Sequence, residues 1–502
     1  MGATRTVAKN TILLTVGVLF GRALSALLIR FMTPELGTEG VGIWGTATDL
    51  TAILLVVTNW GLGTLLTREV TRNRGLTPSL LWATLRIRWV LGALCYGLMW
   101  VFVRASGYAA LDTAAVLITG LAIFIEATAM ACDAVLQAHE KVEHQSTSQI
   151  VSALVYFGLG WLWLEQGHGL MGVVWANVVS RVVRLAVAAP LMFRCCGPWR
   201  GAPDAGPAPG MLWMLRLGLP MFMATTFGII YNKVDTVMLK NILGNDAAGV
   251  YVLGHRALDV MILVPSLFGF ALFPAMARYG MESAAAAARM GERALRFMLV
   301  AVVPLTLFLT FTAGPLIRFF DKEGQFPDSV PVLMIVIWAL PLQAANTIFG
   351  RLLITANRER AFVTIGLVAM LANVALNSLW IPRHSYFGAS WATFISVGVS
   401  LLMHLRWLQP TAYRVPLLRA LLGPVAATAA AWAATVGILA LAAPGWGAGW
   451  TRLPLQAWIP FLGTTGLMTV LYAVAVLLLR VIRRGDLDLL RELRPPVAGR
   501  GR

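Results

Sequence analysis

The chain of 502 residues is 58% hydrophobic and only 13% charged, and its net charge is +17. Soluble domains carry about 25% charged residues, so too few polar side chains are present here to cover a water-soluble protein of this size. The basic residues lie in short segments between long apolar runs, which indicates membrane topology and anionic lipid head groups rather than binding of nucleic acid.

Apolar segments follow one another along the whole chain, and each is long enough to cross a bilayer, which takes roughly 20 residues. They are continuous rather than alternating, which argues against an outer-membrane β-barrel. The sequence therefore predicts an all-α, polytopic membrane protein of about 14 transmembrane helices, at residues 11–32, 41–65, 79–103, 113–137, 146–165, 169–193, 213–239, 247–277, 293–313, 329–354, 361–381, 386–408, 417–443 and 455–482.

The connecting segments predict the orientation. One alternate set, which includes both termini, holds 23 Lys and Arg residues, whereas the opposite set holds 6. By the positive-inside rule both termini are expected in the cytoplasm, with the basic tail along the inner leaflet. The longest external segment, 314–329, is too short for a folded external domain.

The second half of the chain repeats the first. Residues Leu36 to Trp44 (LGTEGVGIW) return as Leu243 to Tyr251 (LGNDAAGVY), and Gly172 to Ala176 (GVVWA) returns as Gly388 to Ala392 (GASWA). Both repeats keep the same orientation, because an even number of spans separates the copies. We expect five parts: a six-helix lobe at 1–195, a cytoplasmic linker at 196–212, a second six-helix lobe at 213–410, two extra helices at 411–483 and a basic tail at 484–502.

Several stretches now point to a known family. Residues Asp49 to Val70 resemble the end of the second helix of polysaccharide repeat-unit flippases. Leu217 to Pro220, followed by Asn232 to Asp235, is similar to the start of their second lobe, and Leu379 to Pro382 is similar to their eleventh-to-twelfth helix junction. The resemblance covers about residues 10–410 with collinear spacing. It indicates the superfamily of multidrug, oligosaccharidyl-lipid and polysaccharide exporters.

The resemblance implies a function and partners. The expected substrate is an undecaprenyl-pyrophosphate-linked oligosaccharide, which is moved across the cytoplasmic (inner) membrane by alternating access. Membrane lipids, a polysaccharide polymerase and other assembly proteins are the partners that such a role implies. Lipid II flippases are close relatives, but their first helix usually carries an Arg-Asp pair. Here Arg22 is followed by Ala23, so the Arg-Asp pair is absent, which makes a lipid II flippase the less favoured alternative.

Cations within the spans are the candidate substrate-binding residues, because a charge at mid-bilayer usually faces a cavity or a partner. Arg22 lies near the middle of the first span, and an ion pair with Asp49 is its structural alternative. Asn177, Arg181 and Arg184 follow i, i+4, i+7 spacing on one helix face, where guanidinium groups suit phosphate. Two further cations complete the set of substrate-binding candidates, Arg256 and Arg351. Arg86 and Arg88, near the inner end of the third span, are expected to snorkel, and attraction of pyrophosphate at the mouth of the cavity is the alternative.

Acidic residues within the spans are candidates for coupling or gating. Glu126 and Asp133 share one face of the fourth span, and Glu126 is expected near the bilayer centre. It could neutralise Arg22 or Arg181, or bind a coupling proton. The other acidic candidates are Asp49 in the second span and Asp235 and Asp259 near the external ends of spans. The cation Lys233, two residues before Asp235, is also a candidate for coupling or gating.

Other functions are weighed by what the sequence holds. No metal cluster, nucleophile triad or phosphate-binding glycine loop is evident, so we expect neither enzyme activity nor a cofactor. A cation-coupled multidrug exporter usually has twelve spans and a less cationic cavity. A membrane glycan ligase or polymerase generally needs a larger external loop than 314–329. A membrane scaffold without transport is the remaining alternative.

Overall fold

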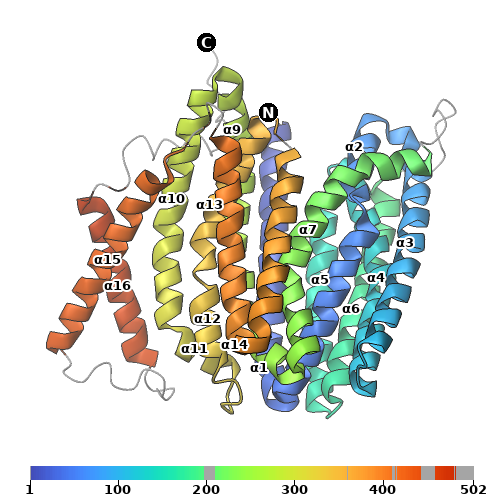
Figure 1. Ribbon diagram of the computed structural model, residues 1–502. Coiled ribbons are helices and arrows are strands. Elements are labelled where there is room, and N and C mark those ends of the chain that lie inside the picture. The colour runs from blue at the N-terminus through green and yellow to red at the C-terminus, as the bar shows by residue number, and fades with distance from the viewer. Residues whose placement is uncertain are drawn as a thin grey trace. The chain divides into compact units, whose positions relative to one another are not determined.

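The computed structural model describes residues 2–196, 210–358, 360–409, 413, 415–442, 458–479 and 481, and all regular secondary structure in these residues is helical (Figure 1). The elements are α1 (Gly2–Asn59), α2 (Leu62–Arg72), the 3₁₀ helix η1 (Arg74–Leu76), α3 (Thr77–Ala105), α4 (Ala110–Ala138), α5 (Val142–Glu165), α6 (Gly169–Cys195), α7 (Met211–Leu243), α8 (Asn245–Met261), α9 (Leu263–Glu282), α10 (Ala284–Phe311), α11 (Ala313–Phe320), α12 (Ser329–Val336), α13 (Ala339–Thr355), α14 (Arg360–Leu408), α15 (Leu417–Ala442) and α16 (Trp458–Leu478).

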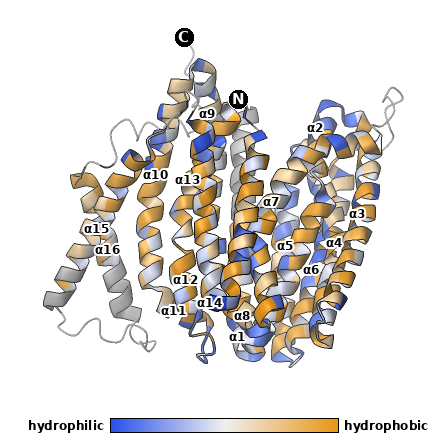
Figure 2. Cartoon of the chain, in the orientation of Figure 1, coloured by the Kyte–Doolittle hydropathy of each residue, from blue (hydrophilic) through white to orange (hydrophobic). Residues whose placement is uncertain are grey.

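Among the described residues, eleven helices are long and apolar enough to cross a membrane. Two of them are double: α1 has 58 residues and α14 has 49. At 1.5 Å per residue these helices extend roughly 87 and 74 Å, which is more than twice the thickness of the hydrocarbon core. With α16 the number of possible crossings reaches the expected fourteen. The prediction of an all-α membrane protein is confirmed, and Figure 2 shows the hydrophobic residues that cover these helices.

Sharp kinks separate the two crossings of each double helix. Gly37 takes φ 60° within α1, and Ser385 takes φ 54° within α14. Glycine adopts this left-handed backbone without a steric cost, whereas serine is strained by it. Both kinks fall in the segments predicted to join two spans.

Three boundaries differ from the prediction. The span expected at 41–65 is interrupted at Trp60 and Gly61, which take φ 44° and 69° and separate α1 from α2. The expected loop 278–293 is mostly helical, since only Ser283 separates α9 from α10. Its hydroxyl caps α10 by accepting a hydrogen bond from the Ala286 N–H at 3.1 Å. The segment 314–329, which the sequence predicts to be external, begins within α11.

The chain divides into two compact units. The first comprises Met1–Val252, Phe320–Gln325 and Asn373–Ala389, and the second comprises Leu253–Phe319, Phe326–Ala372 and Ser390–Arg502. Helix α7 thus belongs to the first unit. The five parts of the chain predicted from the sequence stay a prediction. They were defined by internal sequence repeats, whereas the two units are defined by compactness, so the units do not test them.

Small residues position the polar groups of the first unit. The buried face of α4 is rich in alanine and glycine, such as Gly120, Ala127 and Ala134. Small side chains let helices approach closely in a membrane, and α4 packs against α1, α3 and α6. This packing places the acidic residues of α4 opposite the arginines of α6.

In the second unit, α10 packs against α9, α13 and α15. The two C-terminal helices are joined to it by specific contacts. The Tyr472 hydroxyl on α16 donates to the Val300 carbonyl at 2.5 Å. On α15 the Trp432 ring stacks on Phe311 with centroids 5.8 Å apart.

Candidate functional site

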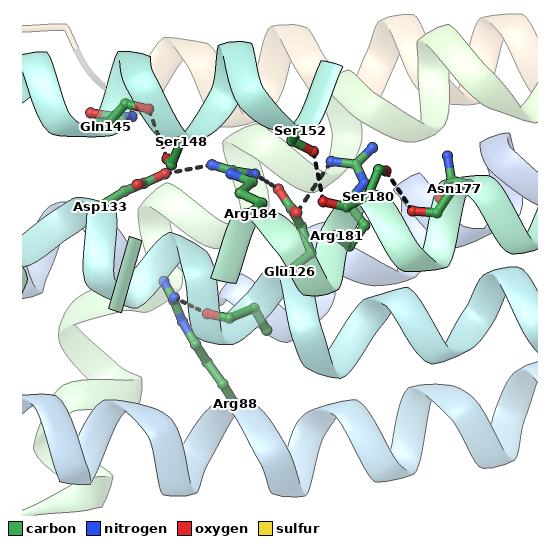
Figure 3. A network of polar contacts seen from close by, with 11 residues as sticks. Arg88, Glu126, Asp133, Gln145, Ser148, Ser152, Asn177, Ser180, Arg181 and Arg184 are labelled. Carbon is green, nitrogen blue, oxygen red and sulfur yellow. Dashed lines mark hydrogen bonds and ion pairs between the residues drawn. The ribbon is translucent and has the colours of Figure 1, made fainter. Parts of the chain in front are cut away.

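A buried network of charges lies between α4 and α6 in the first unit (Figure 3). The Arg184 guanidinium forms ion pairs with both carboxylates of α4. Its Nη1 pairs with Glu126, and its Nη2 lies 2.5 Å from Asp133 Oδ2. Arg181, one helical turn earlier, places Nη1 3.2 Å from the other oxygen of Glu126. The predicted spacing on α6 therefore brings both arginines to the acidic face of α4.

The two arginines differ in accessibility. The Arg184 side chain is 8% exposed and lies between side chains of Glu126 and Asp133 that are 9% and 6% exposed. The Arg181 side chain is 36% exposed, although it pairs with the same glutamate. Arg181 is thus open on one side, whereas Arg184 is enclosed by its two partners.

Position along the helix shows how deep Arg181 lies. It stands 12 residues from the start of α6 at Gly169 and 14 from its end at Cys195. At 1.5 Å per residue it is about 18–21 Å from either end of this helix. An arginine at such depth is costly unless it is paired or lines a polar cavity.

Small polar side chains continue the network. The Ser152 hydroxyl on α5 donates to the Ser180 carbonyl at 2.9 Å, and the Ser180 hydroxyl donates to the Asn177 carbonyl at 2.7 Å. Asn177 itself is half-buried. The predicted stripe of Asn177, Arg181 and Arg184 is therefore next to α5 as well as α4 (Figure 3).

Arg88 on α3 is a member of this region that sequence reasoning missed. It was expected to snorkel, which is wrong, because the residue is fully buried. Its Nη1 donates to the Ala127 carbonyl at 2.6 Å, and its Nη2 donates to the Asn59 side chain at the end of α1. The signal that could have found it is the polar Asn59 directly before the Trp60–Gly61 break. Arg86, two residues earlier, is exposed as expected.

These groups carry an excess of positive charge. With every group ionised, three arginines (Arg88, Arg181 and Arg184) face two carboxylates (Glu126 and Asp133). A low-dielectric interior makes an uncompensated cation costly, and an anion at the open side of Arg181 would offset that cost.

Helix α7 carries two of the predicted coupling residues, Lys233 and Asp235, and one of them pairs with a third, Asp49 on α1. The Lys233 ammonium lies 3.3 Å from Asp49 Oδ1 on α1. Asp235 is buried and accepts hydrogen bonds from the Tyr251 hydroxyl at 2.7 Å and from the Asn377 amide at 2.6 Å. Asp49 thus has an ion-pair partner on α7. Arg22, which the sequence suggested as the alternative partner of Asp49, is exposed on α1.

A second cluster ties the other end of α7 to α4, on the side that the sequence predicts to be external, and was also missed. Asp112 is buried in the first turn of α4 and pairs with Lys240. The Lys240 ammonium lies 4.8 Å from the centre of the Tyr108 ring, and the Asn245 amide donates to Asp112 at 3.2 Å. Burial raises the pKa of the Tyr108 hydroxyl, which precedes α4, to about 12.

The second unit holds the remaining candidates. On α8, Asp259 lies 3.6 Å from His255 Nδ1 and 3.9 Å from Arg256 Nη1, as the i, i+4 and i, i+3 spacings predict. On α13 the Arg351 guanidinium lies 5.7 Å from the centre of the Phe273 ring. Among the described residues, no group of three or more His, Cys, Asp or Glu side chains is placed to hold a metal ion.

Comparisons with known proteins show the family of the chain. The model of the family described as polysaccharide biosynthesis protein matches residues 7–280, and the MatE family model matches residues 220–379. The first match covers more than half of the chain, so the chain belongs to the polysaccharide biosynthesis protein family. The resemblance found in the sequence is thereby confirmed.

Named relatives are similar at low identity. The probable low-salt glycan biosynthesis flippase Agl15 of Haloferax volcanii is 22% identical over 410 residues, which cover 80% of this chain and 83% of the relative. The lipid II flippase MurJ, in an inward closed conformation, superposes with a TM-score of 0.72 at 14% identity, over 96% of this chain and 100% of that one. A multidrug resistance MATE family transporter of the MOP superfamily, in an inward-facing conformation, superposes with a TM-score of 0.63 at 14% identity, over 78% and 94%. At this identity, these structures show the fold that the chain shares with them.

Proposed function

We propose that the protein is a flippase that moves a polyprenyl-pyrophosphate-linked oligosaccharide across the cytoplasmic membrane during polysaccharide biosynthesis, by alternating access. The observation that carries the proposal is Arg181, a partly exposed cation deep within α6 whose charge is shared with a single glutamate. A guanidinium at this depth offers forked donors to a phosphate group. The family and the glycan flippase named among its relatives support the same substrate class.

The alternatives differ in what the cavity must bind. A lipid II flippase would also bind a pyrophosphate, whereas a multidrug exporter of the MatE type would bind cationic drugs. The surplus of arginine over carboxylate in the network of Arg88, Arg181, Arg184, Glu126 and Asp133 favours an anionic substrate. We therefore favour a flippase for a lipid-linked oligosaccharide or for lipid II over a drug exporter. A membrane ligase or polymerase is the least favoured of these functions.

Deleting the gene tests the substrate. The expected result is accumulation of a lipid-linked oligosaccharide on the cytoplasmic face of the membrane, with its glycan identified by mass spectrometry. Accumulation of lipid II, or of no lipid-linked glycan at all, would contradict the proposed substrate. Restoration by the wild-type gene is the control.

Orientation is tested by Cys195 and Cys196 at the end of α6, which we propose to face the cytoplasm. An impermeant maleimide should label them in inverted vesicles and leave them unmodified in intact cells. Burial raises the pKa of Cys196 to about 11, so roughly one thiol in a thousand is ionised at pH 8 and labelling needs long exposure.

A cysteine at Gln166, exposed between α5 and α6, provides the matched external control, because it should label in intact cells. Labelling of Cys195 or Cys196 from outside intact cells would reverse the proposed orientation.

Glu126 is proposed to couple transport to protons. When pyrophosphate draws Arg181 away, the carboxylate loses one of its partners and takes up a proton, so that loading is accompanied by proton uptake. Glu126→Gln imitates the protonated carboxyl and should bind substrate but make flipping insensitive to an imposed pH gradient. The measurement is flipping in proteoliposomes with and without the gradient.

The matched control is Glu292→Gln on α10, a glutamate that pairs with Arg296 at 2.7 Å in the second unit. This variant should keep the response to the gradient. If the wild type ignores the gradient, or if Glu126→Gln responds as the wild type does, Glu126 is only a structural counter-ion.

A further inference from the structure

An exposed arginine stands within the apolar face of α3. Arg86 lies nine residues after the first residue of this helix, Thr77, and the helix contains no acidic residue. At 1.5 Å per residue, Arg86 is about 14 Å from the start of α3. No hydrogen bond, ion pair or ring contact joins its guanidinium to another residue that the structure describes, whereas Arg88 and Arg184 both have such partners. The donors of Arg86 are therefore available to a ligand.

The face of α3 that carries Arg86 contacts lipid. Positions at helical spacing from Arg86 hold large apolar side chains that are 50–63% exposed: Trp82, Trp89, Val90, Leu94 and Leu98. A contiguous exposed apolar face on a membrane-spanning helix is solvated by lipid chains. Figure 1 shows α3 at the edge of the first unit, and Figure 2 shows the hydrophobic residues along it. The ligand of Arg86 is thus a component of the bilayer.

Two tryptophans flank Arg86 on this face. Trp82 precedes it by four residues and Trp89 follows it by three, so the three side chains are neighbours on the helix surface. Trp89 donates from its indole N–H to the Thr128 hydroxyl on α4 at 3.1 Å, yet it stays 50% exposed. Tryptophan is enriched at the level of the lipid head groups. The two rings therefore mark the depth at which a lipid phosphate comes within reach of Arg86.

The side of α3 behind Arg86 is fixed to α4. The Thr128 hydroxyl accepts the hydrogen bond from Trp89 and donates to the Phe124 carbonyl at 2.8 Å. The carbonyl of Ala127, the residue before Thr128, accepts a hydrogen bond from the buried Arg88. Because these contacts already hold the helix and one of the rings, a ligand would have little to order except the Arg86 side chain.

The exposed charges before α3 are mostly positive. Arg68, Arg72 and Arg74 are exposed on α2 and η1. The acidic residue among them is Glu69, which lies 3.0 Å from Arg68 and 3.4 Å from Arg72. The carboxylates of α4 that face this region are buried in the network between α4 and α6. A basic surface beside a bilayer favours anionic lipids over zwitterionic ones.

We propose that Trp82, Arg86 and Trp89 form a binding site for one anionic phospholipid. The lipid phosphate accepts forked hydrogen bonds from the Arg86 guanidinium, and the acyl chains lie along Leu94 and Leu98. The bound lipid covers the seam between α3 and α4 on the side away from α6, and so stabilises the first unit. The proposal depends neither on the proposed substrate nor on the proposed orientation, because the site lies outside the buried charge network.

Native mass spectrometry of the purified full-length protein tests the site. Dioleoyl-phosphatidylglycerol should bind the wild type more tightly than dioleoyl-phosphatidylcholine. Arg86→Ala should raise the Kd for phosphatidylglycerol about fivefold or more, which corresponds to about 1 kcal/mol. The variant is expected to fold, because Arg86 is exposed and no described residue depends on it. An unchanged Kd, or equal affinity of the wild type for the two lipids, would overturn the proposal.

Arg104→Ala is the matched control. Arg104 is an exposed arginine in the last turn of the same helix, and its guanidinium also lies beside a tryptophan, 5.9 Å from the centre of the Trp100 ring. Its replacement removes the same charge and should leave the Kd for phosphatidylglycerol unchanged. An equal rise for both variants would mean that the lipid is held only by the net charge of the protein, and would contradict a site at Arg86.

Heat unfolding in detergent distinguishes a phospholipid from other sources of phosphate. Phosphatidylglycerol should raise the midpoint of the wild type and have little effect on Arg86→Ala, because a ligand stabilises only the folded state that binds it. Inorganic phosphate at the same concentration should raise neither midpoint. If inorganic phosphate stabilises the wild type as well as phosphatidylglycerol does, or if undecaprenyl pyrophosphate displaces the phospholipid in the mass spectra, the assignment of the site to a phospholipid is wrong.

Discussion

Replacing Arg181 by alanine is expected to lower transport of the lipid-linked oligosaccharide by about 10- to 150-fold, since a charge-assisted contact with phosphate contributes about 1.5–3 kcal/mol. Arg181→Lys should retain more activity but stay well below the wild type, because an ammonium lacks the forked donors of guanidinium. The measurement is export of polymer at equal expression. Arg181 is chosen because its side chain is 36% exposed beside Glu126.

Arg194→Ala is the matched control for this loss. Arg194 lies in the last turn of the same helix, α6, and is exposed. Its replacement should leave export unchanged. Wild-type export by Arg181→Ala at equal expression would refute the assignment of Arg181 to the substrate.

Replacing Arg184 by alanine is expected to destabilise the protein rather than to alter substrate affinity alone. The change would leave the buried carboxylate of Asp133 unpaired and take one partner from Glu126. Breaking a buried pair in this way costs about 3–5 kcal/mol. The midpoint of heat unfolding in detergent should fall by about 5 °C or more.

Two comparisons separate this effect from a general loss of charge. Combining Arg184→Met with Asp133→Asn removes one buried cation and one buried anion together, leaves Glu126 paired with Arg181, and should recover most of the midpoint. Arg72→Ala breaks a surface ion pair: Arg72 is 66% exposed and lies 3.4 Å from Glu69. This variant should shift the midpoint of heat unfolding little. A midpoint for Arg184→Ala equal to the wild type would contradict the enclosed ion pairs.

Periodicity and hydropathy sufficed to predict the helical spans. In a bilayer every backbone polar group must form its hydrogen bonds within the protein, so few structures other than helices can span it. The i, i+4, i+7 stripe of α6 and the acidic face of α4 were visible for the same reason: both follow from position on a single helix. Their pairing through Arg181 and Glu126 was one of the options that the sequence left open.

Contacts between distant helices were not predictable in this way. The burial of Arg88 depends on the approach of Asn59 and Ala127 from other helices, and the partner of Asp49 proved to include Lys233. The repeat revealed that Gly42 and Gly249 are equivalent, but not that they pack against each other. Such pairings depend on how the helices of the whole unit pack together. The sequence pattern of a single helix does not show which residues of other helices it will contact.

Flipping by the purified protein tests the central claim most directly. Proteoliposomes would carry an undecaprenyl-pyrophosphate-linked oligosaccharide from the source cell on one leaflet, and its appearance on the other leaflet would be followed with a membrane-impermeant glycosidase or lectin. The account predicts rapid transfer by the wild type and almost none by Arg181→Ala at equal reconstitution. Transfer no faster than in protein-free liposomes, or equal transfer by both proteins, would contradict it.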